Sequence, residues 1–273
     1  MNGLTKKERE KQKQERLGME KVNKQGCLMK VIEYNGCMDI IVEFQDEYKY
    51  KINTRWDHFK DGNIKNPYAP STYNTGIIGT KYPISEKINN KNKSTKEYKL
   101  WQRVLERCYN DKYKEKYPIY KDATCCKEWL YFPNFYEWVH SQENFEKWLN
   151  GERWAIDKDI LIKGNKIYSP ETCCLVPQNV NSLFTKANSI RGDYPIGVHW
   201  HSANQKFCAK CRNPFINEEE IIGEYNDPIK AFYAYKKYKE KLIKQVAEDE
   251  YSNGNIIKSC YDSMMSYKVE ITD

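Results

Sequence analysis

The stretch WAIDKDILI contains two acidic residues, Asp157 and Asp159, spaced two positions apart. Residues two apart on a β-strand point to the same face, so the two carboxylates would lie side by side. Together with Asn179 or Asn181 from the helix that should follow, they could hold one Mg²⁺ ion. Such an ion orients a substrate and neutralises the negative charge that develops during hydrolysis. The alternative is that Asp157, Lys158 and Asp159 form a solvated or ion-paired strand end.

A hydrolytic centre of this kind also needs a general base, and histidine is the usual one. The residue between the two carboxylates is Lys158, and a protonated ammonium group cannot accept a proton at neutral pH. The chain has four histidines. His58 belongs to the N-terminal part, and His140 lies on or just after a predicted helix. His199 and His201 alternate along one face of a strand near the C-terminal end, so no histidine supplies the missing base in an obvious way.

The ten cysteines are interpreted as reduced thiols, because the chain has no secretory features. Structural zinc sites favour CxxC knuckles, which supply two ligands from one tight turn. Cys208 and Cys211 have this spacing, but they lie in a predicted strand, where they would face opposite ways. We therefore expect no structural zinc and interpret the cysteines as buried thiols. Five further cysteines, all in the region 96–190, suggest zinc only weakly: Cys108, Cys125, Cys126, Cys173 and Cys174.

The elements that must position these residues indicate an α+β fold. Residues 1–16 are polar and form an arm or a frayed helix, with Thr5 as its cap and Glu8 completing a capping box. Residues 17–84 read as a small β domain of three to five strands, because β-branched runs flank an Asn35-Gly36 turn signal. Residues 85–95 are polar and without periodicity, and they are interpreted as a linker.

The second half of the chain predicts two further parts. Residues 96–190 form a helical plus ββα module, with helices over 95–110 and from about Pro133. Residues 194–251 form a three-stranded sheet packed on one long helix, which Asp227 caps and Pro228 opens. Residues 252–273 form a tail that ends in a short strand-like run, YKVEITD.

Composition limits the function classes. Lys and Arg number 45 and Asp and Glu number 38, which gives a net charge of +7, compatible with a nucleic-acid partner. Aromatic residues make up 14% of the chain, which excludes full disorder. No apolar run approaches the ~20 residues of a membrane span, and residues 1–16 lack the apolar core of a secretory signal. We therefore expect a cytoplasmic protein without a membrane partner.

The region 96–190 contains a recognisable set of residues: Trp101, Leu105, Arg107-Cys108-Tyr109, Tyr117-Pro118-Ile119-Tyr120, Cys126, Glu128-Trp129, Phe132, Phe135, Asp157-Lys158-Asp159-Ile160, Gly164-Asn165, Tyr168 to Cys173, Val176-Pro177 and Asn181. With this set the region resembles the HNH-type proteins of bacteriophages and prophages. Active HNH proteins carry an Asp-His pair on the first hairpin strand, and the histidine activates water while the Asp and a later Asn or His hold one divalent cation. Asp157 matches this Asp, Lys158 stands at the histidine position, and Asp159 follows. The resemblance therefore implies a degenerate centre with no required cofactor, and Mg²⁺ only if activity is retained.

The region 194–251 contains a second set of residues: Ile196-Gly197-Val198, Lys206 to Ala209, Ile222 to Tyr225, Ala231, Tyr235 and Lys239. With this set the region resembles the AP2 DNA-binding domain found in phage endonucleases and integrases. In that family the three-stranded sheet enters the major groove of double-stranded DNA and the helix supports it from behind. The corresponding outward residues are His199, His201, Lys206, Lys210 and Arg212. Arg212 would read guanine, and the lysines would bind phosphate. The acidic connection 213–220 departs from this pattern, because it would repel DNA if it faced the groove.

Four functions follow from these resemblances. The first is a phage-type DNA-binding protein built on a degenerate, non-catalytic HNH-like module plus an AP2-like module. The second is an anti-defence inhibitor that blocks a host nuclease complex, for example of the Gabija type, by protein contact in the host cytoplasm. The third is an active metal-dependent HNH homing-type endonuclease, and the fourth is a transcriptional or architectural DNA binder. The sequence does not decide the oligomeric state.

Overall fold

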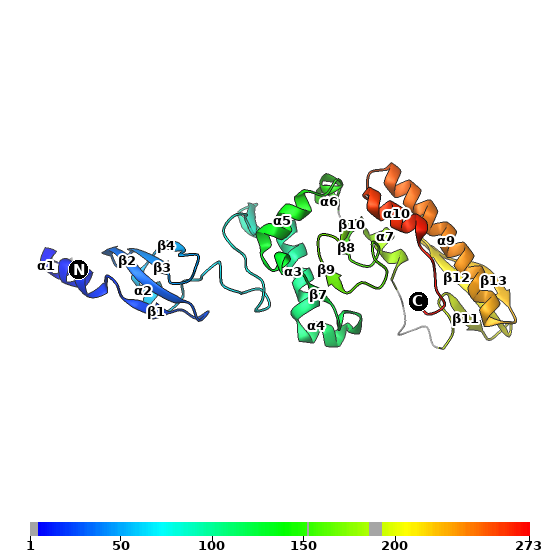
Figure 1. The fold of residues 1–273 in the computed structure, drawn as a ribbon, viewed down its shortest axis with the longest axis horizontal. Coiled ribbons are helices and arrows are strands. Elements are labelled where there is room, and N and C mark those ends of the chain that lie inside the picture. The colour runs from blue at the N-terminus through cyan, green and yellow to red at the C-terminus, as the bar shows by residue number, and fades with distance from the viewer. Residues whose placement is uncertain (1–4, 152, 186–192) are drawn as a thin grey trace. The chain divides into compact units, whose positions relative to one another are not determined.

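The computed structural model describes residues 5–151, 153–185 and 193–273. The chain is α+β, as predicted, and its strands form several small sheets (Figure 1). It divides into two compact units. Unit 1 comprises residues 1–116 and 127–136, and unit 2 comprises residues 117–126 and 137–273. None of the helices in the described ranges is long and apolar enough to cross a membrane.

Unit 1 begins with helix α1 (Lys6–Arg16), which carries the predicted capping box of Thr5 and Glu8. No residue of this helix is buried, so an apolar stripe does not hold it in place. Its last residue attaches it instead. The Arg16 guanidinium lies 4.4 Å from the ring centre of Trp56 and donates a hydrogen bond to the Tyr34 hydroxyl at 2.5 Å. The arm is therefore anchored through a cation–π contact at its C-terminal end.

The small β domain is an open four-stranded antiparallel sheet in the order β1-β2-β3-β4. Residues alternate between buried and half-buried along β3, as expected for a sheet with one covered face. The core contains Met29, Val31, Val42 and Phe44, and helix α2 covers it through the buried Phe59. The element bounds are β1 (Glu20–Val22), β2 (Leu28–Gly36), β3 (Asp39–Phe44), β4 (Lys51–Thr54) and α2 (Trp56–Lys60).

The hairpin turn between β2 and β3 is not at Asn35-Gly36 as predicted. Gly36 pairs with Asp39, so the connecting residues are Cys37 and Met38. Irregular pairing between Val31 and Glu33, and again between Tyr34 and Gly36, shifts the register toward the tip. Gly36 has a φ of +149°, a conformation that glycine adopts without strain, so its role is in an irregularity of the strand rather than in the turn.

Residues 85–95, predicted as a linker, instead form a β-hairpin that leads into a helix cap. Strands β5 (Ser85–Ile88) and β6 (Lys91–Ser94) pair antiparallel, and Asn89 and Asn90 connect them. Both asparagines have positive φ, +51° and +61°, which is the geometry of a two-residue type I′ turn. We call this element the ribbon.

The predicted helix over 95–110 is confirmed as α3 (Lys96–Tyr109), with Thr95 as its cap. Its buried face includes Trp101, whose indole N–H donates to the carbonyl oxygen of Trp129 at 2.6 Å. The helix predicted from about Pro133 is α5 (Phe132–His140). Between α3 and β8 the chain also forms α4 (Asp111–Lys116), η1 (Pro118–Tyr120), η2 (Glu128–Leu130) and α6 (Phe145–Asn150).

The first strand of the predicted ββα module is shorter than the run WAIDKDILI. Its partner strand is not the next strand along the chain. Strand β8 (Trp154–Asp157) ends at Asp157 instead of continuing through residue 162. It pairs antiparallel with β10 (Cys174–Pro177), and helix α7 (Gln178–Leu183) follows directly. The intervening β9 (Ile167–Tyr168) pairs in parallel with β7 (Thr124–Cys125). The order strand, strand, helix is thus present, although the two strands are not consecutive.

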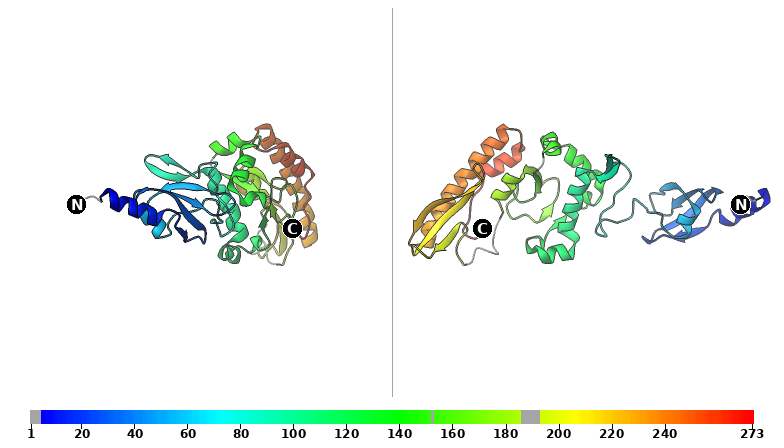
Figure 2. Two further views of the ribbon diagram at one scale, coloured as in Figure 1. Left: turned by 60° about the vertical axis from the view of Figure 1, so that its left-hand side comes forward. Right: turned by 180° about the vertical axis from the view of Figure 1, so that it is seen from behind.

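The C-terminal sheet and helix agree with the sequence prediction. Strands β11 (Val198–His201), β12 (Lys206–Asn213) and β13 (Glu218–Tyr225) form an antiparallel sheet with β12 in the centre. Helix α9 (Pro228–Ser252) packs along one face of this sheet (Figure 2). Asp227 caps the helix by accepting the N–H of Ile229 at 2.7 Å.

Residues 252–273 are integrated into unit 2 and are not a free tail. They contain helix α10 (Lys258–Ser266), and the run YKVEITD is not a strand. Val269 of this run is buried in the same core as Ile160, Val176 and Leu242. That core therefore joins β10, α7, α9 and α10 in one hydrophobic cluster.

Candidate nucleic-acid interface

The sheet β11–β13 has one covered and one uncovered face. Val198, Ala209 and Cys211 belong to the core that also contains Tyr235 of α9. Because side chains alternate along a strand, the residues between these positions point away from the helix. All five residues predicted to contact DNA lie on this other side, which we call the open face: His199, His201, Lys206, Lys210 and Arg212.

Close packing of helix α9 keeps the open face on the outside. Gly197, which precedes β11, has a φ of +75°, and a methyl group built there would overlap the Tyr235 ring at Cδ2. Only glycine permits this approach of backbone to ring. The Gly197–Tyr235 contact therefore fixes how β11 sits on the helix.

Three of the open-face residues are held by polar partners. His201 Nδ1 lies 3.1 Å from Glu224 Oε1. Lys210 forms an ion pair of 2.7 Å with Glu219, and Arg212 donates to the Asn217 side chain at 2.7 Å. Exposed ion pairs contribute only about 0–1 kcal/mol, so replacing Glu219 by a phosphate group would cost little. These partners orient the cationic groups without burying them.

His199 differs from the other four because its Nδ1 is buried and has no hydrogen-bond partner within the described residues. Burial, together with the charge of Lys210, lowers the pKa of His199 below its ordinary value. The imidazole is therefore neutral at pH 7, and His199 adds no charge to the open face.

Sequence reasoning missed an apolar residue in the middle of this face. Ile221 pairs with Lys210 across the strands and is 72% exposed. An exposed apolar side chain among cations can contact the methyl group of thymine. Its position could have been found from the alternation in EEEIIGEY, which places Ile221 and Glu219 on the same side.

The acidic connection is divided between the two faces. Glu219 lies on the open face with Lys210. Glu220 is on the helix side, where it accepts hydrogen bonds from Tyr238 and Asn213. The Tyr238 hydroxyl is the main reason that the pKa of Glu220 is lowered. Only part of the predicted repulsion therefore faces outward.

The predicted hydrolytic centre is a self-bonded turn at the end of β8. Asp157 Oδ1 accepts the backbone N–H groups of Asp159 and Ile160, both at 2.7 Å. Burial raises the pKa of Asp157, although these two hydrogen bonds oppose the shift. Because the strand ends at this residue, Asp157 and Asp159 do not present their carboxylates from successive outward positions of one strand.

Lys158 is buried, and its ammonium group is engaged in two hydrogen bonds. Its ammonium group donates to Asp159 Oδ2 at 2.7 Å and to the carbonyl oxygen of Asn165 at 2.8 Å. An ammonium group in this setting donates and cannot act as a general base. This geometry corresponds to the ion-paired strand end that was the alternative interpretation of these residues.

The Asn179 side chain is engaged away from Asp157, because its Nδ2 donates to Glu250 Oε1 at 2.6 Å. Helix α7 carries both Asn179 and Asn181. Asp157 is opposite Cys174 at one end of the strand pair, whereas α7 starts from the other end. The donor set predicted for Mg²⁺ is not assembled as one site. In the ranges that the structure describes, no three His, Cys, Asp or Glu side chains are grouped to hold a metal ion.

The expectation of buried thiols holds for six of the ten cysteines, whereas Cys27, Cys125 and Cys126 are half-buried and Cys37 is exposed. Burial raises the pKa of Cys173 to about 12, and it also raises the pKa of Cys211 in the C-terminal sheet. Both thiols are therefore protonated at neutral pH and act as apolar core groups.

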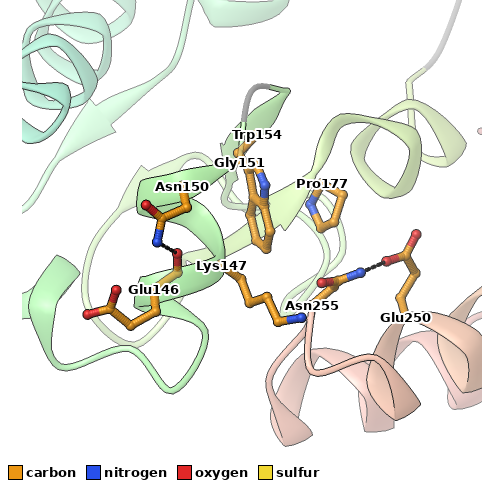
Figure 3. A pocket seen from close by; sticks show the side chains of 8 residues that line it. All are labelled: Glu146, Lys147, Asn150, Gly151, Trp154, Pro177, Glu250 and Asn255. Atoms are coloured by element: carbon orange, nitrogen blue, oxygen red, sulfur yellow. Dashed lines mark hydrogen bonds between the residues drawn. The ribbon is translucent and has the colours of Figure 1, made fainter.

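Unit 2 also contains a shallow cleft of about 540 Å³ (Figure 3). Trp154 and Pro177 form one side of it, and Glu250 and Asn255 contribute from the end of α9 and the residues that follow. The Glu250 carboxylate accepts hydrogen bonds from Asn179 and Asn255 at 2.6 and 2.7 Å. Glu250 and Asn255 of the cleft are thus bonded to each other.

Comparison of the whole chain with protein-family models, with curated proteins and with solved structures finds no match in any of the three.

Proposed function

We propose that this protein binds double-stranded DNA through the open face of β11–β13 and does not cleave it. The observation that carries the proposal is the placement of five predicted DNA-contact residues on the one face of the sheet that α9 leaves uncovered. A sheet supported from behind by a helix can present such a face to the major groove, where base edges differ in their hydrogen-bonding pattern. HNH-like and AP2-like ancestry, as the sequence resemblance suggests, is part of this proposal.

The expected contacts follow from side-chain chemistry. Arg212 offers two parallel donors that match the O6 and N7 acceptors of guanine. Lys206 and Lys210 would bind phosphate oxygens and position the sheet without reading sequence. Ile221 would contact a thymine methyl group.

Asp157 and Lys158 at the end of β8 support the absence of cleavage. A phosphodiesterase of the HNH type needs a base to activate water, and Lys158 instead donates two hydrogen bonds from a buried position. Asp157 uses one carboxylate oxygen to accept two backbone N–H groups. These bonds stabilise a turn and leave no assembled base and metal pair.

DNA binding is tested with a pair of matched double variants. We expect Lys210→Gln with Arg212→Gln to weaken binding to a random pool of duplexes, and the loss of the Arg212 pairing with guanine alone should cost about 1–3 kcal/mol. The control is Lys237→Gln with Lys241→Gln, which removes the same charge from exposed positions of α9. The readout is a titration at several salt concentrations. Equal binding by both variants would contradict the assignment of the open face.

Cleavage is tested with supercoiled plasmid and either Mg²⁺ or Mn²⁺. We expect no nicked or linear product from the purified protein. Nicking that disappears in Asp157→Ala would show that the centre is active, and the third function inferred from the sequence would replace this proposal.

A second candidate is the inhibitor of a host nuclease complex, which two observations favour. Residues 194–251 contain nine Lys and Arg and nine Asp and Glu, so this segment has no net charge. Phe215, Ile216 and Ile221 are also more than half exposed, which suits a protein surface. Co-elution with a purified Gabija-type complex, without any DNA binding, would favour this function.

A further inference from the structure

The positive charge of the chain is concentrated outside the open face. Residues 85–116 contain ten Lys and Arg and five Asp and Glu, so they carry five of the seven excess positive charges. The segment 194–251 contributes none. A protein that binds a polyanion gains affinity mainly where cations exceed anions, because each neutralised phosphate releases counterions. A DNA-binding function therefore calls for a cationic element within residues 85–116.

The ribbon β5–β6 is the most exposed element in this segment. All four residues of β5 are exposed, as are Lys91, Asn92 and Lys93 of β6. Lys91 is opposite Ile88, and Lys93 is opposite Glu86, so these two lysines share one face. Lys87 is opposite Asn92 on the other face. Both sides of the ribbon therefore carry a cation.

The lysines of the ribbon differ from those of the open face in their partners. Lys210 is paired with Glu219 at 2.7 Å. In contrast, Lys87, Lys91 and Lys93 make no ion pair within the part of the chain that the structure describes. Their charges are available to an external anion without first displacing a carboxylate.

The shape of the ribbon also suits DNA. The Asn89-Asn90 turn has the type I′ geometry that matches the twist of two antiparallel strands. The major groove of B-DNA admits a two-stranded β-ribbon. A two-stranded hairpin buries no core of its own and is only marginally stable in water, so contact with a partner would stabilise it further.

We propose that the ribbon is a second DNA-binding element, in which Lys87, Lys91 and Lys93 contact the phosphates on either side of a groove. This inference rests on the proposed function, since it requires that the protein binds duplex DNA. The contacts are to phosphate, so they add affinity without sequence preference.

The test is the salt dependence of duplex binding by the full chain. We expect Lys87→Gln, Lys91→Gln and Lys93→Gln together to lower the slope of log K against log salt by about 2.7, at about 0.9 for each phosphate that is no longer neutralised. Binding should weaken equally for duplexes of different sequence. The matched control is Lys230→Gln, Lys237→Gln and Lys241→Gln on α9, also three exposed lysines, which should leave the slope near the wild-type value. Replacing the three ribbon lysines by Arg should retain the wild-type slope.

The outcomes separate this inference from the proposed function. If the wild-type chain binds DNA and the ribbon variant keeps the wild-type slope, the ribbon inference is wrong and the open face remains the interface. If ribbon and control variants show the same reduction in slope, a specific role for the ribbon is also wrong. If the wild-type chain does not bind duplex DNA even at low salt, both proposals fail.

Discussion

At the scale of single residues, Asp157 shows how a residue of catalytic type can serve structure. Its carboxylate accepts two backbone N–H groups, and burial raises its pKa. The folded state therefore holds a proton that the unfolded chain has already released, and stability falls as the pH rises from about 4 through the folded pKa. At pH 7 the ionised carboxylate lowers the stability of the folded state, whereas its two hydrogen bonds raise that stability.

This balance predicts opposite results for two substitutions. Asp157→Asn keeps an oxygen acceptor and removes the charge, so we expect it to be at least as stable as the wild type at pH 7, with an advantage that is smaller at pH 5 than at pH 7. Asp157→Ala leaves two N–H groups without an acceptor and should cost about 2–4 kcal/mol. Urea unfolding at both pH values measures the difference. An Asn variant as unstable as the Ala variant would show that the negative charge itself is required.

A second prediction at this scale concerns Cys37, an exposed thiol beside the anchor of α1. Its hydrogen bond with Tyr34, and then the one from Arg16, lower the pKa of Cys37. The thiolate therefore forms at lower pH than for an ordinary cysteine, and alkylation should accelerate at correspondingly lower pH. Iodoacetamide labelling from pH 6 to 9, followed by peptide mass spectrometry, gives the midpoint.

The matched controls for Cys37 lie on the same helix. Arg16→Gln should move the labelling midpoint upward, whereas Arg9→Gln, an exposed position of α1, should not. The buried Cys173, whose pKa is raised to about 12, should stay unlabelled in the folded protein. An unchanged midpoint in Arg16→Gln would refute the role of the guanidinium.

At the scale of elements, the seating of β11 on α9 depends on one glycine. Gly197→Ala would force a methyl group against the Tyr235 ring and place a non-glycine residue at a φ of +75°. We expect a loss of about 2–4 kcal/mol, from overpacking and from backbone strain. Gly164→Ala is the control, because its φ is +79° and nothing lies within 4 Å of the added carbon. It should cost only about 1 kcal/mol, and equal losses in denaturant unfolding would contradict the packing argument.

Local signals explain which elements the sequence could predict. The Asp227-Pro228 start of α9 and the Thr95 cap of α3 are chemical signals carried by one or two residues, and both helices begin where expected. The alternation in β11 and β12 likewise placed all five candidate DNA contacts on one face. These features depend on neighbours within a few positions in the chain.

Other features of the fold could not be predicted in this way. The ribbon was missed because Asn89 and Asn90 adopt positive φ without a glycine, between strands that have no apolar alternation. The turn after β2 was misplaced because two irregularities shift the pairing. In the centre at Asp157, the burial of Lys158 and its bond to Asn165 arise from a turn whose path depends on packing.

At the scale of the whole molecule, residues after α9 belong to the core of unit 2. Val269 is 3% exposed, and its backbone bonds to Glu240 and Lys236 of α9. We expect Val269→Ala to destabilise unit 2 by about 2 kcal/mol, from reduced burial and the remaining cavity. Ile271→Ala, at a position that is 43% exposed, should change stability little. Thermal unfolding followed by circular dichroism compares the two, and equal melting temperatures would contradict the packing of this segment.

The hydrophobic cluster that joins Ile160 and Val176 to Leu242 and Val269 determines whether parts of unit 2 can fold alone. A fragment that starts at Tyr194 would expose to solvent the part of α9 and α10 that these earlier residues cover, and we expect it to aggregate. The sheet and the strand pair before it should therefore melt in a single calorimetric endotherm. We therefore expect neither part to fold stably when it is expressed without the other.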